Sequence, residues 1–189
     1  MQNPIIFIGL NKTGTARLTQ ILQDHYQINA LHSVQRFDDV REGLKANNTQ
    51  RVTELLSTHE AYLDGNWWRI LPQLLDLFPN IRLIHTTRDY DCWVNSRTAH
   101  ILRNRIIGQT PEWQHINYDD WLIAWNENHT LAKELNLTSI DITGETNNPG
   151  IEILPQLLGQ QPTTEPSKRK KQHSMTSMMC EIITHLSQS

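Results

Sequence analysis

Short runs of apolar residues alternate with longer stretches of helical periodicity along most of the chain. Ile5 to Ile8 are four consecutive apolar residues, the pattern of a strand buried on both faces. Further strands are predicted over 27–31, 61–63, 81–87 and 137–142. Strands that alternate with helices are typical of a mostly parallel sheet with helices on both faces, so the sequence predicts an α/β fold.

The segments between these strands carry apolar residues at the spacing of amphipathic helices. Helices are predicted around 18–22, once or twice within 36–60, over 67–78, from Asp89 or Asp91 to about Arg105, over 120–135 and over 151–158. Residues 108–119 are predicted to form a loop or lid. No internal repeat is present, so the pattern describes a single layered unit.

The length of 189 residues favours one domain. We expect residues 1–160 to form the α/β domain and 161–189 to form a basic linker and an amphipathic tail of that same domain. The run Lys168 to Lys171 allows two interpretations. It is either a basic segment that closes over a phosphate site or a solvated run of charges.

Overall charge narrows the function classes. A formal net charge of -3 provides no global basic field for nucleic acid or a membrane surface. No stretch approaches the roughly 20 apolar residues of a membrane span, and no leader precedes the first strand. Two isolated cysteines, Cys92 and Cys180, provide neither a disulfide framework nor metal-ligand spacing. We therefore expect a cytoplasmic protein without a metal ion, and the oligomeric state stays open.

The loop after the first strand carries one lysine among small residues. Its N–H groups and the positive end of the following helix attract an anion, and phosphate suits them best. Lys12 adds a charge, while Thr13 and Thr15 add hydroxyl donors. In a Walker loop the lysine follows the second glycine, whereas Lys12 comes two residues before Gly14. The sequence thus predicts a phosphate-binding loop in which the lysine precedes the second glycine, unlike a Walker loop.

A second anion site is predicted where the strand over 81–87 ends. Arg88 follows that strand directly, at the carboxyl edge where open α/β sheets bind ligands. Ser96 lies early in the following helix and can face the same edge. An arginine fork with a hydroxyl suits a second phosphate. The alternative is that Arg88 pairs with an acid at a helix end and that Ser96 is an exposed helix residue.

The two motifs together resemble those of the sulfotransferases. Gly9-Leu-Asn-Lys12-Thr-Gly14-Thr15 is similar to the family's 5′-phosphosulfate loop, with Asn11 at the position of the usual proline. Arg88-Asp-Tyr-Asp-Cys-Trp-Val-Asn-Ser96 is similar to its 3′-phosphate motif, with Tyr90 at another usual proline position. The resemblance extends over residues 5 to about 160. It implies the sulfotransferase fold, which resembles that of the P-loop NTPases.

The resemblance also implies a reaction. The donor is 3′-phosphoadenosine 5′-phosphosulfate (PAPS), and its sulfuryl group moves in line to a hydroxyl or amine of an acceptor. Lys12 is implied to be catalytic, because a fixed positive group stabilises the charge that develops on the bridging oxygen. The residues implied to bind the donor are Asn11, Lys12, Thr13, Gly14, Thr15, Ala16, Arg88 and Ser96.

An acceptor hydroxyl needs a base within hydrogen-bond reach. His32 ends the second predicted strand, where some relatives place a glutamate or histidine base, and Asp64 ends the third. We prefer His32, since histidine titrates near neutral pH, and keep Asp64 as the alternative. Candidate acceptor contacts are Arg17, Trp68 and Trp113. The sequence does not identify the acceptor, which is a small molecule, a glycan or a lipid.

Two other functions compete with sulfuryl transfer. A small-molecule kinase of the P-loop class would use Asp64 to hold Mg²⁺, but Lys12 is wrongly placed for that class. A non-catalytic nucleotide-binding module would keep the two phosphate sites without a base and dock a partner through residues 160–189. Binding of 3′-phosphoadenosine 5′-phosphate (PAP) rather than ATP distinguishes a sulfotransferase from a kinase. Transfer activity distinguishes a sulfotransferase from a non-catalytic module.

Overall fold

The computed structural model of the chain describes residues 3–108, 115–143 and 149–163. Within these residues the strands form one five-stranded sheet in the order β2-β3-β1-β4-β5. Every pair of neighbours is parallel, as the sequence predicts. The strands are β1 (Ile5–Phe7), β2 (Ala30–His32), β3 (Ala61–Leu63), β4 (Arg82–Thr86) and β5 (Ser139–Ile140).

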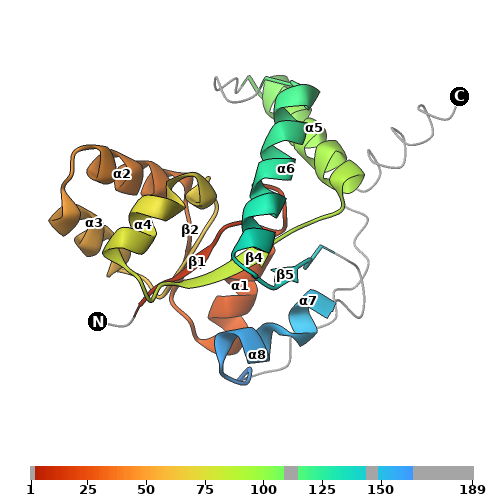
Figure 1. Cartoon of the computed structure of the whole chain (residues 1–189). Coiled ribbons are helices and arrows are strands. Elements are labelled where there is room, and N and C mark those ends of the chain that lie inside the picture. Colours follow the sequence, from red (N-terminus) through yellow and green to blue (C-terminus); the bar gives the residue numbers. More distant parts are fainter. Residues whose placement is uncertain (1–2, 109–114, 144–148, 164–189) are drawn as a thin grey trace, which may run out of the picture.

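Helices cover both faces of this sheet (Figure 1). They are α1 (Thr15–Tyr26), α2 (Val34–Lys45), α3 (Thr49–Leu56), the 3-10 helix η1 (Trp67–Ile70), α4 (Leu71–Leu77), α5 (Tyr90–Ile106), α6 (Tyr118–Glu134), α7 (Pro149–Glu152) and α8 (Leu154–Leu158). Alternate residues of the first strand face opposite cores. Ile6 packs with residues of α2 to α6, while Ile5 and Phe7 pack with those of α1 and α8. The predicted α/β class is confirmed.

The direction of the crossovers explains this division. The first connection leads from β1 past the place of β3 to β2, and the later ones run the opposite way across the sheet. Because crossovers between parallel strands are right-handed, α1 lies on one face and the helices of the later connections on the other. The reversal occurs beside β1, so the loop after β1 opens where such sheets bind ligands.

Local signals account for most element boundaries. The segment 36–60 contains two helices because Asn48 caps α3, accepting a hydrogen bond from the N–H of Arg51 at 3.0 Å. Asp89 caps α5 in the same way, with the N–H of Cys92 at 3.0 Å.

Residues 164–189 lie outside the described residues. The predictions for the basic run and for the amphipathic tail therefore concern residues that the structure does not describe. No helix of the described ranges is long and apolar enough to cross a membrane.

A buried polar network joins α6 to the strands beside the first loop. The side-chain amide of Asn128 donates to the Ile8 carbonyl at 2.7 Å, and its oxygen lies 2.8 Å from Nε2 of His85. The other ring nitrogen of His85 lies 2.7 Å from the Ser139 hydroxyl. Since the Asn128 oxygen can only accept, His85 carries a proton on Nε2. The network holds Ile8 immediately before the loop.

This network makes stability depend on pH. Burial lowers the pKa of His85, the hydrogen bond to Asn128 partly opposes this, and His129 lowers it further. In the unfolded chain His85 takes up a proton near its usual pKa of 6.5, whereas in the folded chain it stays neutral to lower pH. The stabilisation is therefore complete above pH 6.5 and decreases on acidification, by at most about 1.4 kcal/mol per pH unit.

We expect urea denaturation between pH 7.5 and 5.5 to show this decrease. His85→Gln removes one titrating ring and should reduce the slope of this dependence, while His59, His100 and His129, whose pKa values are also lowered, should keep part of it. A free energy of unfolding that rises on acidification over this range would contradict the assignment.

Candidate active site

The loop between β1 and α1 ends in a helix N-terminus without a side-chain cap. Gly14 occupies the capping position with φ +87°. Glycine has no side chain, so no side-chain oxygen at this position accepts a hydrogen bond from the first N–H groups of α1. A side chain at residue 14 would meet Ile142 at 2.9 Å. The first turn of α1 contains no acidic residue. Its N–H groups are therefore available to an anion, as the motif predicts.

Lys12 is the one lysine of this loop, and its charge is partly buried. Its ammonium makes no hydrogen bond or ion pair among the described residues. Burial lowers the pKa of Lys12 from its usual 10.5, Asp64 opposes the shift, and Arg103 and Arg97 add to it. An anion bound at the loop would offset the desolvation of this charge and favour the ammonium form.

The two threonines of the loop have different surroundings. Thr13 is only 3% exposed, and its hydroxyl donates to the Leu10 carbonyl at 2.6 Å and lies 2.9 Å from the Thr86 hydroxyl. This corrects the expectation that the Thr13 hydroxyl donates to an anion, and leaves its N–H for that role. The Thr15 hydroxyl instead lies 3.0 Å from Nε2 of His32.

The second predicted anion site lies against the first. Arg88 follows β4, and its Nη1 donates to the Lys12 carbonyl at 3.4 Å. Its Nε is buried and has no hydrogen-bond partner in the described part of the chain. Ser96 comes from α5, and both residues line the same cavity as Lys12. The alternative pairing of Arg88 with an acid is absent from the described residues.

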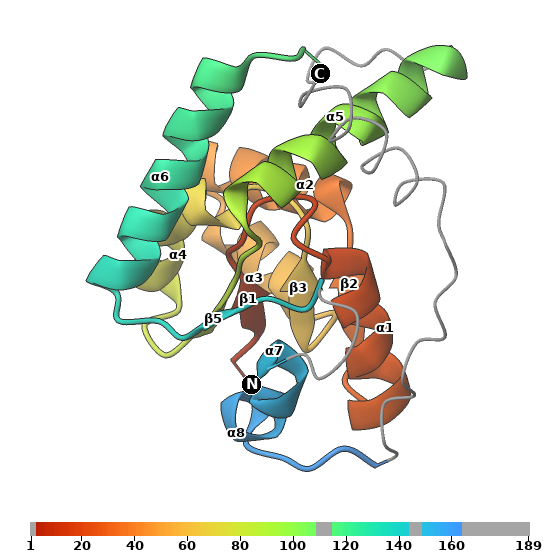
Figure 2. The ribbon, with the colours of Figure 1, turned by 90° about the vertical axis from the view of Figure 1, so that its right-hand side faces the viewer.

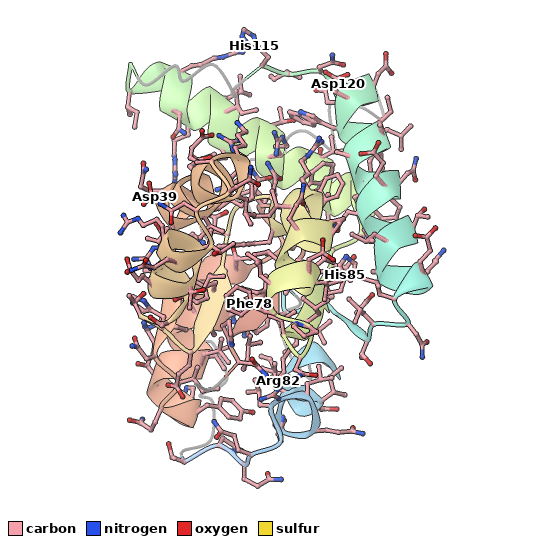
Figure 3. The ribbon with its side chains drawn as sticks, turned by 60° about the vertical axis from the view of Figure 1, so that its left-hand side comes forward. Asp39, Phe78, Arg82, His85, His115 and Asp120 are labelled. Carbon is pink, nitrogen blue, oxygen red and sulfur yellow. The ribbon has the colours of Figure 1, made fainter. Side chains whose placement is uncertain are left out.

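That cavity has a volume of about 930 Å³ and opens at the carboxyl edge of the sheet. Its size falls within the range of small-molecule sites, about 300–1,000 Å³. In Figure 3, His115 and Asp120 mark this end of the molecule, and Arg82, at the start of β4, lies far from it. The predicted site residues that line the cavity are Asn11, Lys12, Gly14, Thr15, Ala16, His32, Asp64, Arg88 and Ser96.

The two candidate bases are neighbours at the ends of β2 and β3. Nε2 of His32 lies 3.6 Å from a carboxylate oxygen of Asp64, and their side chains are 33% and 15% exposed. Asp64 and Gly65 both have positive φ, at 67° and 95°. The indole N–H of Trp67 donates to the Asp64 carbonyl at 2.6 Å, which holds this unusual turn in place.

Of the three predicted acceptor contacts, the two that the structure describes, Arg17 and Trp68, do not line the cavity. Arg17 turns toward β5, where its Nη1 donates to the Ile142 carbonyl at 2.8 Å. Trp68 is 8% exposed and belongs to the core beneath α4, with Arg69 stacked over its ring at 4.5 Å. Trp113 lies outside the described residues. The structure thus supports neither Arg17 nor Trp68 as a wall of the site.

Several lining residues were missed by the sequence reasoning. The cavity also takes Phe37, Asp38 and Arg41 from α2, Arg69 from η1, Arg97 and His100 from α5, and Trp121 from α6. Trp93, Arg97 and His100 recur at helical spacing after Arg88, and this was the signal that could have identified the face of α5. Sequence periodicity alone did not show whether this face of α5 lines a cavity or packs into the core.

His100 adds a neutral group to a basic surrounding. Burial and the charges of Lys12, Arg103 and Arg97 lower the pKa of His100 to about 4, while Asp64 opposes the shift. His100 is therefore an uncharged imidazole at neutral pH. No group of three or more histidine, cysteine, aspartate or glutamate residues capable of holding a metal ion occurs in the described ranges.

Comparison with known proteins agrees with this geometry. The sulfotransferase domain family matches residues 4–147, which include the loop, both candidate bases and the Arg88–Ser96 pair. Comparison with curated proteins found no match. The family match covers well over half of the chain and extends from β1 past β5. The chain therefore belongs to the sulfotransferase family.

Proposed function

We propose that the protein transfers a sulfuryl group from PAPS to a hydroxyl or amine of its acceptor. The observation that carries this proposal is the shared cavity of the two anion sites. The Arg88 guanidinium reaches the main chain of the lysine loop at 3.4 Å, and Lys12, Arg88 and Ser96 line one space. A single ligand with two anionic groups fits this arrangement better than two separate anions.

The residues present fit the two ends of such a donor. The N–H groups of residues 12–16 and the Lys12 ammonium suit the 5′-phosphosulfate. Arg88 offers a buried Nε without a partner in the described part of the chain, and a 3′-phosphate would satisfy this donor. Ser96 adds a hydroxyl on the same wall. ATP lacks the 3′-phosphate and would leave the Nε of Arg88 unpaired.

The donor supplies an activated sulfur, which forms a bond to the acceptor oxygen or nitrogen as its bond to the bridging phosphate oxygen breaks. Lys12 contributes a fixed positive charge for the oxygen that leaves. Because its ammonium makes no bond to the described residues, no existing contact has to be broken for this role. The loop N–H groups hold the phosphate in line with the acceptor.

His32 is the proposed base, with Asp64 beside it. When Nε2 takes the acceptor proton, the imidazole becomes cationic, and the Asp64 carboxylate at 3.6 Å stabilises that charge. The Thr15 hydroxyl at 3.0 Å directs the same nitrogen toward the loop. Asp64 remains the alternative base, because it lines the cavity as well.

Substitution can distinguish the role of His32 as the base from that of Asp64 as the neighbouring carboxylate. We expect His32→Gln to lower kcat by about 10²-fold or more, with PAP affinity unchanged, because it removes the group that takes the acceptor proton. Asp64→Asn should lower kcat less, because it removes only the charge beside that group. A rate that survives His32→Gln but is lost in Asp64→Asn would assign the base to Asp64.

Calorimetric titration of the purified protein tests the donor. We expect PAP to bind without Mg²⁺ and at least about tenfold more tightly than ATP, because a charged hydrogen bond is worth roughly 1.5–3 kcal/mol. Binding of ATP that requires Mg²⁺ would overturn the proposal in favour of a kinase. PAP binding without transfer from PAPS to a panel of phenols, sugars and amines would instead indicate the non-catalytic module.

A further inference from the structure

Asn11, in the lysine loop, is held by α5 at two separate atoms. The indole N–H of Trp93 donates to the Asn11 carbonyl at 2.7 Å. Nη1 of Arg97 donates to the Asn11 side-chain oxygen at 2.5 Å. Trp93 and Arg97 are one helical turn apart on α5, which passes beside this loop (Figure 2). The main chain and the side chain of one loop residue are therefore fixed from the same helix face.

The surroundings of Arg97 restrict which side chain can do this. Its guanidinium carbon lies 4.8 Å from the centre of the Trp121 ring and 5.8 Å from that of Trp93. Both indoles are buried, and burial lowers the pKa of Arg97. Arg97 has no carboxylate partner among the described residues, and its Nε makes no hydrogen bond to them. The Asn11 oxygen and the two aromatic faces are the groups that stabilise its charge there.

The next loop residue shows why such a clamp is needed. Lys12 has φ +69°, a left-handed conformation that is strained for a residue other than glycine. A strained conformation persists only where its surroundings impose it. Arg97 and Trp93 hold the residue before Lys12, and Arg88 holds the Lys12 carbonyl. Together they keep the loop in the shape that exposes its N–H groups.

We propose that Arg97 is a positioning residue, which keeps the phosphate-binding loop in its anion-binding shape through Asn11 rather than by contacting the donor. The consequence for donor affinity rests on the proposed function, whereas the shape of the loop itself does not. Trp121 belongs to α6, so the clamp also makes the loop depend on how α5 and α6 pack together.

A double-mutant cycle over Arg97→Ala and Asn11→Ala tests this link. If Arg97 acts through Asn11, each substitution should weaken PAP binding about tenfold, and the double variant should be no weaker than either alone. Losses that multiply in the double variant would show that Arg97 acts independently of Asn11 and would overturn the proposal. Arg103→Ala is the matched control, since Arg103 also lowers the pKa of Lys12 but, among the described residues, hydrogen-bonds to His100 and not to the loop. It should change PAP affinity less than threefold.

A proline at position 11 provides a rescue. The Asn11 N–H makes no hydrogen bond within the described residues, and its φ is not left-handed, so proline removes no bond there while it restricts the chain. In the Asn11→Pro background, we expect Arg97→Ala to change PAP affinity less than twofold. An undiminished loss in that background would mean that Arg97 contacts the donor directly.

A second measurement needs no nucleotide. Trypsin cleaves after lysine, so its rate of cutting after Lys12 in the ligand-free protein reports how often the loop opens. We expect Arg97→Ala to raise this rate several-fold relative to cutting after the exposed Lys45, and Arg103→Ala to leave it unchanged. If wild-type protein bound no PAP, the proposed function would be wrong. The rate of trypsin cleavage after Lys12 would still show whether Arg97 holds the loop. An unchanged rate in Arg97→Ala would overturn the inference.

Discussion

Lys12→Ala is expected to lower kcat for sulfuryl transfer by about 10²–10³-fold, the loss typical of removing one preorganised group that stabilises developing charge. The ammonium makes no bond to the described residues, so its removal breaks no structural contact. Because burial already penalises the charge of Lys12, the substitution should preserve or slightly raise the free energy of unfolding. Initial rates of transfer from PAPS to an acceptor panel measure the effect.

Lys133→Ala is the matched control for this substitution. Lys133 lies in the last turn of α6, is exposed, and does not line the cavity. Its replacement should leave kcat within a factor of two. If Lys12→Ala retained more than a tenth of the wild-type rate, Lys12 would be a residue of the binding surface and not a catalytic group.

Arg88→Ala should weaken the binding of PAP by about 10–100-fold, because it removes the guanidinium that we propose pairs with the 3′-phosphate in a partly buried setting. The loss should depend on the ligand. Adenosine 5′-phosphate has no 3′-phosphate, so its affinity should change less than threefold in the same variant. Calorimetry with the two nucleotides measures both values, and their ratio isolates the contribution of the 3′-phosphate.

Arg51→Ala serves as a control for the loss of one positive charge. Arg51 is exposed on α3, which contributes no residue to the wall of the cavity. An equal loss of affinity for both nucleotides in Arg88→Ala would point to a disturbed loop, since Arg88 also donates to the Lys12 carbonyl. That result would remove the assignment of Arg88 to the 3′-phosphate.

Much of the fold followed from neighbouring residues. The apolar runs predicted each strand to within a few residues, because a strand buried on both faces needs consecutive apolar side chains. Asp89 was one of two predicted caps of α5, and a cap depends only on a side chain reaching an N–H three residues ahead. The position of the lysine loop between a strand and a helix was likewise predicted, since it depends on small residues that are adjacent in the sequence.

Interactions between distant segments could not be predicted in this way. The Thr13 hydroxyl turns inward because Thr86, 73 residues away in the chain, lies on the adjacent strand. Trp68 was expected in the cavity, but the fold places it in the core under α4. The clamp on Asn11 depends on side chains more than 80 residues further along. No local pattern encodes which of these polar groups meet.

The sequence by itself thus determined the layered α/β class, the lysine loop and the arginine at the end of β4, because each depends on residue types at short spacing. The tertiary structure decided that the residues of both predicted anion sites line one cavity, that His32 and Asp64 are 3.6 Å apart, and that Arg97 reaches the loop. The physical reason is that parallel strands bring their carboxyl ends to one edge of the sheet. The order of those strands, and the helix that leans over them, are set by packing across the whole chain.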